Sequence, residues 1–152
     1  MCGGWSYRGV KAACQPPAYL IERLVRNRAW GGNLLANFGP RADGTMQDEF
    51  YTTCDALAAW MKHSSASIYD IHAGGYPDHC TLPVTVKDGT WFVHFLDFQR
   101  PRALLKGVSD PSSAKLLRSG KSVKWYRNEE GVVLQPALDD FTPYDDVVAV
   151  KW

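Results

Sequence analysis

The chain has 152 residues, of which 45% are hydrophobic and 22% charged, so it forms one ordinary globular domain or two small ones with a sizeable core. Its 17 basic and 16 acidic residues give a net charge of +1 without runs of like charge, which argues against nucleic acid and against an anionic membrane surface as partners. No segment approaches the roughly 20 consecutive apolar residues that a membrane-spanning helix needs.

The first regular element predicted is an amphipathic helix that begins at Pro16-Pro17 and ends near Trp30. Residues 1 to 14 are glycine-rich and without period, which is typical of a loop. Proline suits the first turn of a helix, and apolar residues then recur on one helical face. These residues are Leu20, Ile21, Leu24, Val25 and Ala29.

A strand and a second helix are predicted next. The apolar run from Asn33 to Phe38 is closed by Gly39-Pro40, which is typical of a strand buried on both faces. Thr45 and Asp48 have the spacing of a helix cap, and a helix is expected from about Gln47 to Lys62. Its apolar stripe consists of Phe50, Cys54, Leu57 and Met61, and this stripe should pack with Leu20, Leu24 and Leu34. Ligand sites follow such strands, so functional interest falls on Asn37 to Asp43.

After Ser64-Ser65 the hydrophobic period changes to that of strands. This predicts two units, residues 1–65 and residues 66–152. Asp88-Gly89 predicts a hairpin turn that pairs Val84 with Val93 and Val86 with Trp91. Seven or eight short strands without an intervening helix favour an antiparallel β-sandwich. The further strands are expected at 103–106, 115–118, 122–126, 132–135 and 147–152, and the inward-facing residues at Val86, Trp91, Val93, Phe95, Trp125, Val148 and Val150.

No catalytic, metal or cofactor site follows from the residue pattern. Asp43, Glu129-Glu130, Asp139-Asp140 and Asp145-Asp146 lie in turn-like contexts and are interpreted as turn acids exposed to solvent. The groups His72, His79, Cys80 and His94 match no zinc spacing, and His94 is expected on the outer face of the hairpin. The four cysteines are interpreted as scattered small hydrophobes, which leaves the compartment open. The aromatic residues, 12% of the chain, are interpreted chiefly as core, with sugar-stacking surfaces as the alternative.

Four stretches in the same order resemble the α-L-fucosidases of glycoside hydrolase family 29. The longest is Gly-Gly-Asn-Leu-Leu-Ala-Asn-Phe-Gly-Pro-Arg-Ala-Asp-Gly-Thr at 31–45, which is similar to the last barrel strand and following loop of that family. Residues 2–8, 59–62 and 66–69 resemble the family's "Cys … Trp-Gly-Tyr-Arg", "Trp-Leu-Lys" and "Glu-Ala-Ile-Tyr" patterns, with Ser6 in place of a glycine.

The resemblance implies an α+β chain in two parts. The first 65 residues would be a helix-strand-helix remnant of a (β/α)₈ barrel, and the rest would be the antiparallel β-sandwich that follows the barrel in the family. A whole barrel takes about 250 residues, and the chain offers no second parallel strand beside Asn33 to Phe38. We therefore expect the chain to be a C-terminal fragment, with any targeting signal upstream of it.

The implied activity is that of a retaining glycosidase acting on fucosylated glycans. The nucleophile and the acid/base carboxylate would both lie upstream of Met1, so the fragment alone should be inactive. Trp5 would be retained as part of the sugar pocket, or would pack on the barrel rim instead. An alternative function is a non-catalytic carbohydrate-binding or interaction module built on the sandwich. No feature of the sequence fixes linkage preference or oligomeric state.

Overall fold

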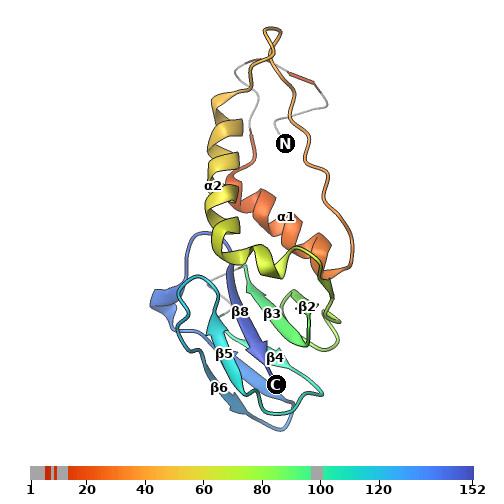
Figure 1. Ribbon diagram of the computed structural model, residues 1–152, viewed down its shortest axis with the longest axis vertical. Coiled ribbons are helices and arrows are strands. Elements are labelled where there is room, and N and C mark those ends of the chain that lie inside the picture. Colours follow the sequence, from red (N-terminus) through yellow and green to blue (C-terminus); the bar gives the residue numbers. More distant parts are fainter. Residues whose placement is uncertain (1–5, 8, 10–13, 97–100) are drawn as a thin grey trace.

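The computed structural model describes residues 6–7, 9, 14–96 and 101–152 and places two helices against two antiparallel sheets (Figure 1). Helix α1 spans Pro17–Ala29, helix α2 spans Asp48–Ser64, and a single 3₁₀ turn, η1, follows at Ser65–Ser67. Both predicted helices are confirmed. Among the described residues, no helix is both long enough and apolar enough to cross a membrane.

The strands form one sheet of five and one of three, as expected for antiparallel pairing. The larger sheet has the order β1-β2-β3-β8-β5, and the smaller has the order β4-β7-β6. The hairpin prediction is confirmed, because Val84 pairs with Val93 and Val86 with Trp91. Strand bounds are β1 His72–Ala73, β2 Val84–Lys87, β3 Thr90–Phe95, β4 Ala103–Leu105, β5 Ser113–Leu116, β6 Lys124–Arg127, β7 Val132–Gln135 and β8 Asp146–Lys151, with a 3₁₀ turn η2 at Leu138–Asp140.

The two sheets share an apolar core. Its buried members come from both sheets, including Val93 and Val148 from the larger and Leu105 and Leu134 from the smaller. Of the residues expected to face inward, Val93, Phe95, Val148 and Val150 are buried in this core, Trp91 packs at its margin and Val86 is half-buried. Trp125 was predicted wrongly. It is 36% exposed on β6, an edge strand whose four residues are all exposed.

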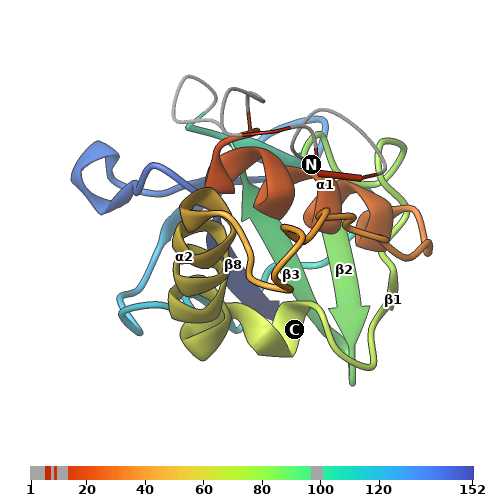
Figure 2. The ribbon, with the colours of Figure 1, turned by 90° about the horizontal axis from the view of Figure 1, so that it is seen from above.

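A second core joins the helices to the other face of the larger sheet. Its buried residues are Ile21, Val25, Trp60, Ile68, Phe92 and Val147. Seen from above, α1 and α2 lie over β2, β3 and β8 (Figure 2). Leu24, Leu57 and Met61 pack at its margin as predicted, whereas Leu20, Leu34 and Phe50 are not part of it. Both faces of β3 are therefore covered, so four successive residues, Phe92 to Phe95, are buried.

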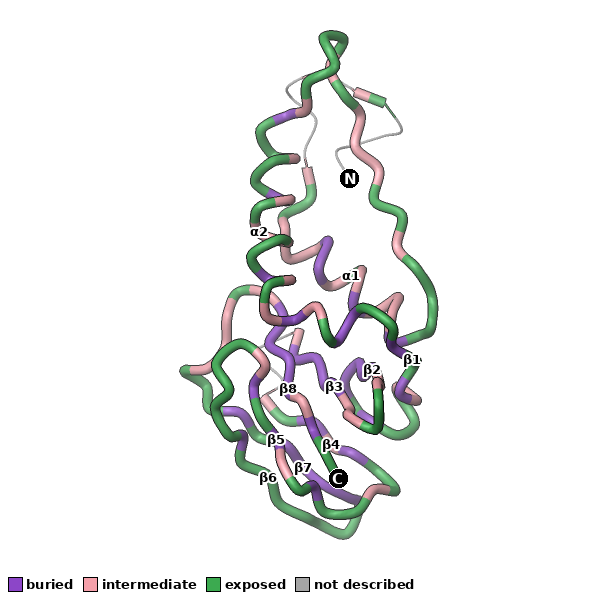
Figure 3. The backbone as a smooth tube through the Cα atoms, viewed as in Figure 1, coloured by how far each residue is buried: buried purple, intermediate pink, exposed green. Residues whose placement is uncertain are grey.

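The predicted strand at Asn33 to Phe38 is not formed. Residues 32–41 have no regular secondary structure and make a long excursion between the helices, largely exposed or half-buried (Figure 3). Leu35 is 86% exposed. A strand needs neighbouring strands to bind its backbone groups, and none of the described strands lies beside this run.

The start of α2 also differs from the prediction. The helix begins at Asp48 after Gln47, and Gln47 makes no capping hydrogen bond with its side chain. Thr45 does not cap the helix because its amide and hydroxyl both bind Asp43. Asp48 and Glu49 still place negative charge at the positive end of the helix. The predicted stripe is only half-buried, and Trp60 is the large side chain that α2 buries.

The two sheet residues Phe95 and Trp125 provide a direct check of this packing. We expect Phe95→Ala to lower the free energy of unfolding by about 3–5 kcal/mol, because it leaves a cavity in the shared core. Trp125→Ala should cost about 1 kcal/mol, since the indole is partly exposed on an edge strand. Urea unfolding followed by circular dichroism measures both. Equal costs would show that Trp125 faces the core after all.

Candidate functional site

The loop from Asn37 to Asp43, where function was expected, is a compact turn at the end of the molecule farthest from the sheets (Figure 1). The backbone amide of Arg41 donates to the carbonyl of Thr45 at 2.8 Å, and the side-chain Nη1 of Arg41 donates to the carbonyl of Met46 at 2.6 Å. Gly44 has a φ of +83° and donates back to the carbonyl of Arg41 at 3.0 Å. The loop is therefore held by its own hydrogen bonds.

Asp43 organises this turn. Its Oδ1 accepts hydrogen bonds from the amide of Thr45 at 2.9 Å and from the hydroxyl of Thr45 at 2.7 Å. The backbone amide first, and then the hydroxyl, lower the pKa of Asp43 below its ordinary value. The two hydrogen bonds confirm the turn role predicted for Asp43.

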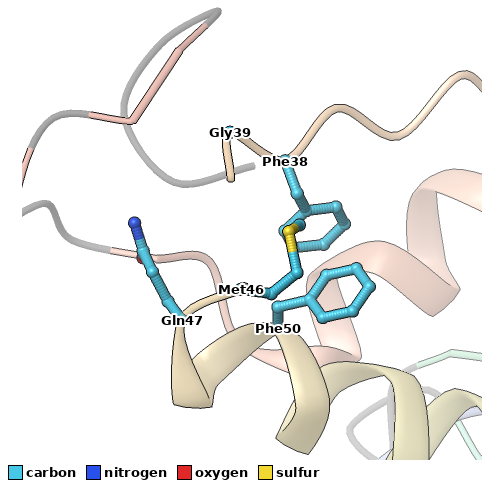
Figure 4. A pocket seen from close by; sticks show the side chains of 5 residues that line it. All are labelled: Phe38, Gly39, Met46, Gln47 and Phe50. Atoms are coloured by element: carbon cyan, nitrogen blue, oxygen red, sulfur yellow. The ribbon is translucent and has the colours of Figure 1, made fainter. Parts of the chain in front are cut away.

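An apolar junction connects this loop to the first turns of α2 (Figure 4). The rings of Phe38 and Phe50 meet edge to face, with centroids 4.8 Å apart and planes at 80°. The side chain of Met46 lies beside both rings, and that of Gln47 points away from them (Figure 4). The space between these side chains has no room for a water molecule. The junction is therefore packing and not a ligand pocket.

Gly39 brings two of the fucosidase-like stretches together. A Cβ atom at this position would collide with the backbone of Ser6 and of Tyr7. The glycine thus allows the N-terminal segment to lie directly against the loop. Trp5, the one substrate-binding residue predicted, lies outside the described residues, so its role stays a prediction.

A chain of buried polar groups links the helices to the larger sheet. Nδ1 of His94 lies 2.6 Å from Oδ2 of Asp145, and both side chains are fully buried. The indole Nε1 of Trp60 donates to the carbonyl of Asp145 at 2.9 Å. On the other side of the ring, Nε2 of His94 lies 3.3 Å from the hydroxyl of Thr85, which itself donates to the carbonyl of Ser67 at 2.7 Å.

Two predictions were wrong here. His94 was expected on an outer face, but the helices cover that face. Asp145 and Asp146 were expected to be solvated, yet they are 0% and 2% exposed. Asp146 binds the amide and hydroxyl of Thr142 and the guanidinium of Arg118. Glu129, Glu130 and Asp139, by contrast, are exposed as predicted.

The hydrogen bonds connect Asp145, His94 and Thr85 in the order of an acid-base-nucleophile triad. The burial of these three side chains excludes catalysis. None of the three side chains reaches solvent. The single hydroxyl hydrogen of Thr85 is donated to Ser67, so its oxygen accepts from Nε2 of His94. Oδ1 of Asp145 has no hydrogen-bond partner among the described residues. The arrangement is a structural polar network.

The cysteines and histidines do not form a metal site in the described part of the chain. No group of three possible metal ligands occurs there. Cys14 is disulfide-bonded, which corrects its interpretation as a scattered hydrophobe. Cys54 and Cys80 are free, and burial raises the pKa of Cys80 to about 12, so this thiol stays protonated and unreactive.

The sequence did contain a signal for the buried network. Residues 91–96, Trp-Phe-Val-His-Phe-Leu, form an almost unbroken apolar run, which is typical of a strand covered on both faces. A histidine inside such a run needs a buried partner. Its partner, 51 residues away, has no local signal.

The same fold occurs in glycoside hydrolases. The structure matches α-L-fucosidase isoenzyme 1 from Paenibacillus thiaminolyticus with a TM-score of 0.84, over 99% of this chain and 38% of that one, at 21% identity. It matches an α-L-fucosidase of family GH29 from Bacteroides thetaiotaomicron with a TM-score of 0.82, over 97% of this chain and 34% of that one, at 20% identity.

Sequence comparison finds similarity to the same enzymes. Residues 1–66 match the family model for Alpha-L-fucosidase. Plasma alpha-L-fucosidase of Homo sapiens is 26% identical over 124 residues, which are 76% of this chain and 27% of the human protein. The protein of that name from Rattus norvegicus is 36% identical over 53 residues, 35% of this chain and 12% of its own length. The chain thus spans about a quarter of the human relative.

The electrostatics of the loop can be checked at Thr45. Thr45→Ala removes one of the two hydrogen bonds to Asp43, so the pKa of Asp43 should rise toward its ordinary value, while Thr45→Ser should keep it low. A pH titration of the Asp43 carboxyl ¹³C shift by NMR measures this pKa. Because the pKa is lowered in the folded loop, the turn should be ordered above the ordinary aspartate pKa and should loosen as the pH falls through the lowered value. Identical titrations in all three proteins would contradict this account.

The buried pair can be checked by a double-mutant cycle. His94→Leu leaves a buried carboxylate without its partner and should cost about 3–5 kcal/mol of unfolding free energy. Asp145→Leu should also be destabilising, whereas the double variant should cost less than the sum of the two, because no unpaired polar group remains. Urea unfolding gives the four values, with Glu129→Gln as the exposed control. Additive costs would show that the two residues act independently.

Proposed function

We propose that this chain is the C-terminal part of an α-L-fucosidase, a retaining glycoside hydrolase that releases terminal L-fucose from glycans. The observation that carries the proposal is the pairing of a family match at residues 1–66 with a fold match over nearly the whole chain but little more than a third of the solved enzymes. Structures similar to this one were solved with fucose and with a mechanism-based inhibitor bound.

In this proposal residues 1–65 supply the last helix-strand-helix portion of a (β/α)₈ barrel, and residues 66–152 form a β-sandwich. Helix α1, the run Asn33 to Phe38 and helix α2 follow one another in the order that a barrel requires. The run is apolar, and Leu35 is left 86% exposed, which is what a barrel strand would show without its two neighbours. Flanking strands would convert this run into a strand.

The catalytic carboxylates would lie in the remainder of the enzyme. A retaining glycosidase needs two carboxyl groups about 5 Å apart that face a sugar pocket. Three of the described acids have structural roles: Asp43 holds a turn, while Asp145 and Asp146 are buried in structural hydrogen bonds. Trp5 would contribute to the wall of the sugar pocket or pack on the barrel rim. The proposal involves no cofactor or metal.

The activity of the chain tests this proposal. We expect the purified 152-residue protein to show no turnover of an aryl α-L-fucoside, because the proposal places both the nucleophile and the acid upstream of it, and acid catalysis alone contributes about 10²- to 10⁴-fold. The same chain extended upstream to a complete barrel should hydrolyse the substrate. Release of the chromophore is followed by absorbance.

Two controls make the result decisive. The extended protein with Thr45→Ser should keep its activity, since that loop hydrogen bond is retained. Turnover by the 152-residue chain that a single carboxylate substitution within it abolishes would refute the assignment of the catalytic groups. Sequencing of the upstream region gives a separate check: a continuous reading frame with a βα pattern is expected there.

A further inference from the structure

A hollow opens beside the turn of the β2–β3 hairpin, at the end of the larger sheet. It has a volume of about 330 Å³ and is lined by Asp88, Gly89, Thr90, Lys151 and Trp152. The strand register explains why these residues meet. Trp91 of β3 lies opposite Val150 of β8, so the two residues that follow Val150 reach the level of the hairpin turn. The volume lies at the lower end of the range of small-molecule sites.

The aromatic wall of the hollow is held in place by its neighbours. Trp152 is 39% exposed, and its indole stands edge-on against Trp91 with ring centroids 5.8 Å apart and planes at 87°. Trp91 in turn packs against the core between the sheets. Ser112 fixes the backbone, because its amide and hydroxyl both donate to the carbonyl of Lys151, at 2.8 and 3.2 Å. A ligand would therefore meet a preformed indole surface.

The polar groups around the hollow are free to bind. The carboxylate of Asp88, the ammonium of Lys151 and the hydroxyl of Thr90 make no hydrogen bond or ion pair with any described residue. Asp88 is held at a φ of +48° by the tight turn, so its backbone position is fixed. An acceptor, a donor and a hydroxyl thus line the same hollow as one exposed aromatic residue.

We propose that this hollow binds a neutral saccharide, with one sugar ring on Trp152 and its hydroxyls on Asp88 and Lys151. A pyranose has an apolar C–H face that suits an indole, and a rim of hydroxyls that both donate and accept hydrogen bonds. Asp88 and Lys151 carry charges of opposite sign, so an ionic ligand of either sign would be repelled by one of them. This binding site does not depend on the hydrolase activity proposed above.

Other ligand classes fit less well. A nucleic acid would meet the carboxylate of Asp88 and a single lysine, whereas nucleic-acid sites need several cations. An extended peptide cannot join the sheet here, because β2, β3 and β8 already have a neighbour on each side. An apolar ligand would desolvate two charged groups without pairing them.

A titration of the 152-residue chain tests the proposal. The ¹⁵N-labelled protein is titrated with 2′-fucosyllactose and, separately, with lactose, and amide and indole shifts are recorded by NMR. We expect saturable shifts at Asp88, Gly89 and Trp152 with a dissociation constant on the order of 1 mM. Trp152→Ala should weaken binding at least about tenfold, and Asp88→Asn several-fold, through the lost charge-assisted hydrogen bond.

Trp125→Ala is the matched control, since Trp125 is exposed to a similar degree but lies on β6 of the other sheet. It should bind as the unchanged protein does, and preserved amide dispersion shows that each variant is folded. Binding of both saccharides supports the site and shows that fucose is not required; binding of 2′-fucosyllactose alone supports it and shows that fucose is recognised. Absence of saturable shifts with either saccharide, or equal weakening by Trp125→Ala, overturns the proposal.

Discussion

The structure depends on one buried circuit of hydrogen bonds that starts and ends in α2. Trp60 donates to the carbonyl of Asp145, Asp145 binds His94, His94 meets Thr85, and Thr85 binds Ser67, which donates to Ser64 at the end of the same helix. The circuit crosses from the helix to the loop before β8, then to β3, β2 and η1. Apolar contacts hold the layers together, but they would tolerate sliding. A chain of directional bonds between fully buried groups specifies one position.

This circuit gives a physical role to part of the fucosidase-like sequence. The tryptophan of the stretch Ala-Trp-Met-Lys is Trp60, which is 2% exposed and spans 85 residues of sequence with a single hydrogen bond. An aromatic side chain with one polar atom suits this position, because its ring fills the core between helix and sheet while its N–H reaches a carbonyl. Phenylalanine would leave part of that space empty and would have no N–H for that carbonyl.

How far the sequence predicts the molecule depends on how local each signal is. The helices and the Asp88-Gly89 hairpin were predicted because their signals lie within a few residues of one another. The burial of His94 and Asp145 was not predicted, because it depends on helices that are distant in sequence and cover the second face of the sheet. The strand prediction at Asn33 to Phe38 was wrong for the opposite reason. Its residues favour a strand locally, but a strand also needs a neighbouring strand to pair with. Thr45 could either cap the helix or bind Asp43. Its amide and hydroxyl donate to Asp43, so it does not cap the helix.

The family match and the packing end at different places. The family model covers residues 1–66, yet the core that contains Ile21, Val25 and Trp60 continues through Ile68 to Phe92 and Val147. Helices α1 and α2 are therefore held by the larger sheet, and they do not require neighbouring barrel strands to keep their position. The loop that carries Asp43 is different, since it lies far from both cores and is ordered by its own hydrogen bonds and by the backbone of Ser6 and Tyr7 against Gly39. The sheet thus provides a rigid base for the helices, while the loop depends on contacts made at its own end of the molecule.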